Sequence, residues 1–87
     1  MKIKEGFILR KVASSYAVVA TGKLVKEFNG VITLNESGAF LWNKLVGGAT
    51  EEDLVTALLN EYEVDKSVAE TDVKKFTEKL LGANIAE

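Results

Sequence analysis

The feature that most constrains this chain is a single change of hydrophobic periodicity near residue 35. Before it, β-branched and aromatic residues gather in short runs, as they do in β-strands. After it, apolar residues recur every three or four positions, as on one face of an α-helix. In a chain of 87 residues this predicts one domain, residues 1–87, in which helices cover a sheet because neither layer can bury its apolar face alone.

Three strands are expected before the change. Residues 7–12 and 16–20 predict an antiparallel pair, because only a short turn separates them. The dipeptide Asn29-Gly30 tolerates positive φ and predicts a hairpin turn that leads into a third strand, residues 31–34. Residues 24–28 fit either a strand or a loop, which leaves open whether the outer edge of the third strand is free.

Three helices are expected after the change, and each follows a residue that favours the helix N-cap: Asn35, Thr50 and Asp65. Gly47-Gly48 and Gly82 are expected to end the first and third helices. Beyond them, Ile85 is expected to fold back onto the core. The apolar residues predicted to face inward from the third helix are Val68, Ala69, Val73, Phe76 and Leu80.

The resulting order is β-β-β-α-α-α. It predicts an α+β fold, a small antiparallel three-stranded sheet followed by three helices, and the last two helices have the proportions of a helix-turn-helix.

The composition argues against catalysis. The chain has no Cys and no His, so it lacks thiolate nucleophiles, the commonest general base and the commonest metal ligands. Helix N-terminal preference explains the acidic residues 51–53 without a metal, and Ser37 has no His to activate it. We therefore expect no enzymatic activity, no cofactor and no metal. With no membrane span or signal peptide evident, we expect a cytoplasmic protein.

Three segments, in order, resemble motifs of the PqqD-like family. Residues 32–42 (ITLNESGAFLW) resemble its LNETGAxLW segment. Residues 48–54 resemble its G-x-T-x-x-x-L/I entry to the second helix, and residues 72–80 resemble its D-V-x-x-F-x-x-x-L third helix. Together they span most of residues 31–81. The ending of this chain, residues 82–85 (GANI), departs from the Gly-Leu-Ile-like ending of the family.

The resemblance implies a RiPP recognition element, also described as a peptide modification chaperone, with a winged helix-turn-helix-like fold. Such domains bind the leader of a ribosomally made precursor peptide and present its core to a tailoring enzyme, often a radical SAM enzyme. In the family, the leader adds as a strand beside the third β-strand and rests on the third helix. The implied partners are therefore a precursor peptide and a radical SAM or other peptide-modifying enzyme.

Strand addition needs an exposed strand edge and pockets for alternate side chains. Side chains alternate along the third strand, and one pair is expected in the core while the other lines a groove. Positions at helical spacing on the third helix would form the opposite wall, with charged residues that orient the peptide through pairs worth about 0.2–1 kcal/mol each. The predicted peptide-binding residues are Val31, Ile32, Thr33, Leu34, Val68, Asp72, Lys75, Phe76 and Lys79.

Two other functions fit the same pattern of elements. A winged-helix DNA-binding protein shares the fold, but residues 65–81 carry four acidic and four basic side chains and no Arg or Gln to read bases, so no nucleic-acid partner is expected. A structural module that forms a homodimer, through the strand edge or by swapping its hairpin, is the third possibility. Structural roles also account for these residues, with Phe76 mainly in the core and Lys74, Lys75 and Lys79 as a solvated face.

Overall fold

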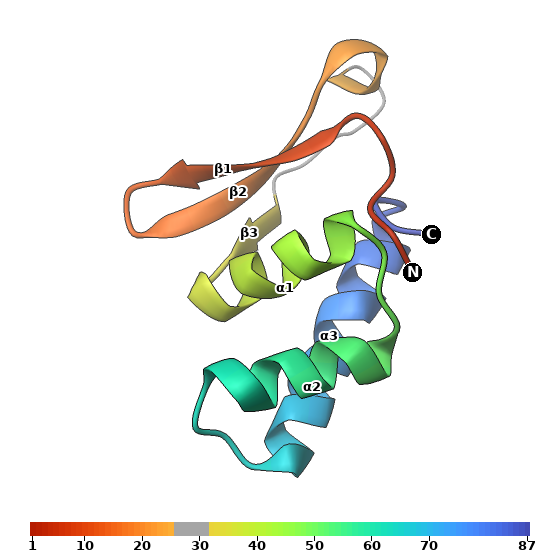
Figure 1. The fold of residues 1–87 in the computed structure, drawn as a ribbon. Coiled ribbons are helices and arrows are strands. Elements are labelled where there is room, and N and C mark those ends of the chain that lie inside the picture. Colours follow the sequence, from red (N-terminus) through yellow and green to blue (C-terminus); the bar gives the residue numbers. More distant parts are fainter. Residues whose placement is uncertain (26–31) are drawn as a thin grey trace.

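The computed structural model describes residues 1–25 and 32–87. It has the expected α+β architecture, a three-stranded antiparallel sheet followed by three helices (Figure 1). The strands are β1 (Phe7–Val12), β2 (Ser15–Ala20) and β3 (Ile32–Leu34), and the helices are α1 (Glu36–Val46), α2 (Glu51–Glu61) and α3 (Lys66–Gly82). Among the described residues, no helix combines the length and the hydropathy needed to cross a membrane.

The sheet has the order β1-β2-β3, so β2 is its central strand. Ala13 adopts a positive φ of 56° in the turn between β1 and β2. In the register of the sheet, Val18 lies between Leu9 and Ile32. Val18 is buried and the other two pack against the core, so this row marks the face of the sheet that the helices cover.

The sequence left residues 24–28 as either a strand or a loop, and the structure excludes a strand for the first two of them. Gly22–Val25 forms a short 3-10 helix, so Leu24 and Val25 do not belong to a fourth strand. The predicted Asn29-Gly30 turn and Val31 lie outside the described residues.

Helix caps form where the sequence places them, with one exception. The Asn35 side chain accepts a hydrogen bond from the Gly38 amide at 2.8 Å. Thr50 and Asp53 form a reciprocal capping box, with both bonds at 3.0 Å. Asp65 is at the N-cap of α3, but its side chain makes no capping bond, so only the position of this cap was predicted correctly.

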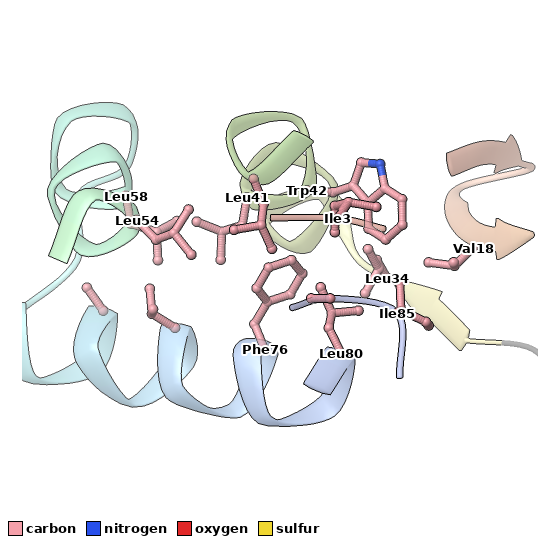
Figure 2. Packing of buried hydrophobic residues seen from close by; sticks show 14 residues of the cluster. Ile3, Val18, Leu34, Leu41, Trp42, Leu54, Leu58, Phe76, Leu80 and Ile85 are labelled. Atoms are coloured by element: carbon pink, nitrogen blue, oxygen red, sulfur yellow. The ribbon is translucent and has the colours of Figure 1, made fainter. Parts of the chain in front are cut away.

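The core fills the space between the sheet and the three helices, and Figure 2 shows Phe76 and Leu80 rising from α3 toward residues of α1 and β3. Val68 was predicted to belong to the inward stripe of α3, but it is 46% exposed. The fully buried residue that the prediction missed is Thr77, whose hydroxyl donates to Glu51 Oε1 at 2.9 Å. Adjacent helical positions point about 100° apart, and Val68 therefore lies off the stripe that continues from Ala69.

The two ends of the chain pair with each other (Figure 1). Lys2 and Glu87 exchange backbone hydrogen bonds of 2.8 and 2.9 Å, and the Lys4 amide donates to the Ile85 carbonyl at 2.9 Å. Ile85 has no exposed surface, so the expected return of this residue to the core is confirmed. We call residues 2–4 and 85–87 the terminal clasp.

Candidate peptide-binding groove

A groove of about 420 Å³ runs between β3, the start of α1 and one flank of α3. It forms because β3 is at the edge of the sheet and leads directly into α1, while α3 packs beneath both. Its lining residues are Thr33, Leu34, Asn35, Ser37, Gly38, Leu41, Leu58, Asp72, Lys75, Phe76 and Lys79.

The fold brings together most of the predicted peptide-binding residues. Those that line the groove are Thr33, Leu34, Asp72, Lys75, Phe76 and Lys79. Ile32 belongs to β3 but packs against the core and does not line the groove. Val68 lies in the first turn of α3, exposed and outside this lining. Val31 falls outside the described residues.

The floor of the groove is apolar and its rim is charged. Leu34, Leu41 and Phe76 are buried members of the core that also line the groove. Phe76 therefore contributes to the core and to the groove at once. The rim consists of exposed charged residues of α3, namely Asp72, Lys75 and Lys79. This combination suits an extended ligand with apolar side chains on one face and polar groups at its margin.

One side of β3 is open to the groove. β3 pairs with β2, and no other strand among the described residues pairs with it. The Thr33 carbonyl faces α3, where Lys79 Nζ donates a hydrogen bond to it at 3.4 Å. In an antiparallel strand the N–H and C=O of one residue point to the same side, so the Thr33 amide also faces the open edge.

The start of α1 forms part of the groove, which the prediction missed. The Asn35 side chain accepts hydrogen bonds from the Gly38 amide and, at 3.0 Å, from the Ser37 hydroxyl. Gly38 lies so close to β3 that a Cβ on it would be 3.1 Å from the Leu34 Cβ. The signal was available, because a strand that turns into a helix within two residues leaves the first helical turn at the same edge.

A second hollow of about 330 Å³ continues from the groove beyond the end of β3, sharing Asn35, Ser37, Leu58 and Asp72 with it and adding Glu36, Tyr62 and Val64. Tyr62 packs edge-on against Phe40, with 5.7 Å between the ring centroids. Burial, followed by the charges of Glu36 and Glu61, raises the pKa of Tyr62. The phenol of Tyr62 is therefore partly withdrawn from solvent at this end of the groove.

Comparison with known proteins agrees with this geometry. The family model for coenzyme PQQ synthesis protein D (PqqD) matches residues 9–86. The chain belongs to the PqqD family. No curated protein matches it.

Two solved structures have the same fold as this PqqD family member. "TbiB1 in Complex with the TbiA(beta) Leader Peptide" has a TM-score of 0.78 and 23% sequence identity, covering 100% of this chain and 95% of that one. "Lasso peptide synthetase B1 complexed with the leader peptide" has a TM-score of 0.72 and 18% identity, covering 93% and 89%.

Proposed function

We propose that this protein is a non-catalytic adaptor that binds the leader segment of a ribosomally synthesised precursor peptide and presents the peptide to a modifying enzyme. The observation that carries the proposal is the open edge of β3 at Thr33, which faces a groove with an apolar floor. Membership of the PqqD family supports it, as do the two similar structures, which are described as complexes with leader peptides.

The leader would bind by adding a fourth strand to the sheet. The leader residue opposite Thr33 would exchange hydrogen bonds with both the amide and the carbonyl of that residue. Its two neighbours would then turn toward α3, because side chains alternate along a strand. Apolar side chains at those two positions would contact the floor formed by Leu34 and Phe76.

The charged rim would set the orientation of the leader more than its affinity. Asp72, Lys75 and Lys79 are exposed, so each pair with a charged leader residue is worth about 0.2–1 kcal/mol. Two cations and one carboxylate in a row along α3 favour a leader with acidic residues near the two lysines. The affinity itself would come from the strand pairing and the apolar floor.

The chemistry on the peptide is assigned to a partner. The chain contains no His and no Cys, so it lacks the side chains that most often act as general base, thiolate nucleophile or metal ligand. A radical SAM enzyme is the partner class that we propose.

The proposal is tested by Thr33→Pro, with Thr33→Val as its matched control. Proline removes the outward N–H and places its ring on the open edge, but it leaves the pairing of β3 with β2 intact, as proline does on edge strands. Valine keeps the N–H and the branched side chain. Short open reading frames beside this gene supply the candidate leader, which is synthesised and titrated by calorimetry.

We expect Thr33→Pro to lose at least about tenfold in affinity, since at least one hydrogen bond and the close approach of the strand are lost. Thr33→Val should bind within about twofold to threefold of the natural chain. Equal binding by the proline variant, with the fold intact by circular dichroism, would rule out strand addition at β3. No binding by the natural chain would contradict the proposed function itself.

A further inference from the structure

Lys79 spans the groove from one wall to the other. It belongs to α3, and its ammonium donates to the Thr33 carbonyl of β3 at 3.4 Å, joining residues 46 positions apart in the sequence. Among the described residues, this is the one hydrogen bond between α3 and β3. The free protein therefore has a side chain lying across the edge that the proposed leader strand would use.

The covered carbonyl is the group on β3 that most needs a partner. β3 consists of Ile32, Thr33 and Leu34, and the amides and carbonyls of Ile32 and Leu34 point the other way, toward β2. An uncovered edge invites pairing with another chain, and lysine is among the residues that natural edge strands use to prevent such pairing. Thr33 is the middle residue, so a donor placed on its carbonyl obstructs any strand that approaches the edge.

We propose that Lys79 is a displaceable strap, which closes the β3 edge to pairing with a second copy of this chain and opens when a leader strand arrives. The opening half rests on the proposed function, whereas the closing half concerns the free protein alone. Displacement exchanges one donor for another, because the leader N–H takes the place of the ammonium on the Thr33 carbonyl. The released ammonium, on a flexible side chain at the rim, returns to water or pairs with a leader carboxylate.

Lys75 provides an internal control. It lies one turn earlier on α3, is exposed and lines the same rim, but it makes no hydrogen bond or ion pair with any described residue. Replacing either lysine removes one positive charge from the rim. Only the replacement of Lys79 uncovers the Thr33 carbonyl, so the difference between the two variants isolates the strap from general electrostatics.

The closing half is tested without any peptide, by sedimentation velocity of Lys79→Met and Lys75→Met over a range of concentrations. We expect Lys79→Met to self-associate at least about fivefold more strongly than the natural chain, and Lys75→Met to behave as the natural chain does. Adding Thr33→Pro to Lys79→Met should abolish the excess. Equal self-association of the two lysine variants, or a natural chain that already dimerises through Thr33, would overturn the proposal.

The opening half is tested by stopped-flow binding of the same synthetic leader segment in about 0.5 M NaCl, where steering by the rim charges is screened. An exposed contact of this kind corresponds to about a twofold to fivefold faster association for Lys79→Met than for Lys75→Met, which loses the same rim charge without uncovering Thr33. A slower association of Lys79→Met would make Lys79 an ordinary rim cation and overturn the strap. If no variant binds the leader, the proposed function fails, and the sedimentation result still decides whether Lys79 guards the edge.

Discussion

The terminal clasp and the β3 edge are both stretches of extended backbone near the surface, and the chain treats them in opposite ways. In the clasp, Lys2 and Glu87 satisfy each other's backbone groups, and Ile85 buries its whole side chain beneath them. At the β3 edge, Thr33 meets one lysine ammonium at 3.4 Å instead of a neighbouring strand. Backbone hydrogen bonds between the two chain ends pair the clasp, while the β3 edge is covered by the side chain of Lys79, which can move away.

The difference shows how the same backbone chemistry serves stability in one place and recognition in the other. Buried backbone groups are almost always paired, so the backbone hydrogen bonds of the clasp stabilise the folded chain. An exposed edge can wait for its partner because water satisfies it meanwhile. The comparison predicts that changes in the clasp alter unfolding and leave leader binding intact, whereas changes near β3 also alter leader binding.

The largest effect is expected from Ile85→Ala in the clasp. Removing a fully buried isoleucine side chain costs about 2–5 kcal/mol of unfolding free energy, to be measured by urea denaturation. Leu81→Ala, which removes an exposed side chain at the end of α3, is the control and should change stability by about 0.5 kcal/mol or less. The comparison breaks if Ile85→Ala, still folded at low temperature, also loses affinity for the leader.

The next largest effect is expected from Gly38→Ala on the groove side. The new Cβ would lie 3.1 Å from the Leu34 Cβ and 3.2 Å from Asn35 Oδ1, so the end of β3 must shift, at about 1–3 kcal/mol. Gly82→Ala has no atom within 4 Å of the added methyl and should be neutral or stabilising by up to about 1 kcal/mol. Thermal denaturation measures both, and a Gly38→Ala variant that binds the leader normally would show that Leu34 need not be fixed.

A smaller effect is expected from Asn35→Ala, which removes the cap between β3 and α1. The cap bond to the Gly38 amide should be worth about 1 kcal/mol of unfolding free energy. Asp65→Ala serves as the control, because Asp65 occupies the same position on α3 without a capping bond and should change little. Chemical denaturation of the two variants compares their losses of unfolding free energy. Equal losses for Asn35→Ala and Asp65→Ala would contradict a stabilising capping bond at Asn35.

The smallest effect concerns Tyr62 in the second hollow, beyond the end of β3. Burial raises its pKa above the value of about 10 expected in the unfolded chain, so the folded protein holds the phenol proton more tightly. The associated stability is fully present below that unfolded value and is lost as the pH rises through the folded pKa. The difference in tyrosinate absorbance between the natural chain and Tyr62→Phe measures the ionisation, and a pKa at or below 10 would contradict the effect of burial and of Glu36 and Glu61.

Local rules were enough for the elements. Val18 and Leu9 in the strands, and the caps Asn35 and Thr50, follow from neighbours a few positions away, and each occurs where the sequence predicts it. The same rules misplaced Val68, because several apolar residues lie side by side in α3 and helical spacing alone does not say which line faces the core. The sheet and the other helices make that choice.

The sequence predicted only part of the lining of the candidate site. Resemblance and periodicity pointed to β3 and one flank of α3, and the fold brings Thr33, Phe76 and Lys79 together there. Leu58 escaped prediction because it reaches the groove from α2 through packing that no local pattern encodes, whereas Asn35 was missed although it directly follows β3.

By itself, the sequence determined the order of the elements, the caps and ends of most helices, and the absence of the His and Cys side chains on which much catalysis depends. These follow from short-range rules of backbone conformation and from composition. Only the tertiary structure decided that the two chain ends close on each other, that Thr77 is buried and Val68 exposed, and that Lys79 lies across the carbonyl of Thr33. The physical reason is that each of these features depends on how elements far apart in the sequence pack together. That packing is set by the burial of apolar surface over the whole chain.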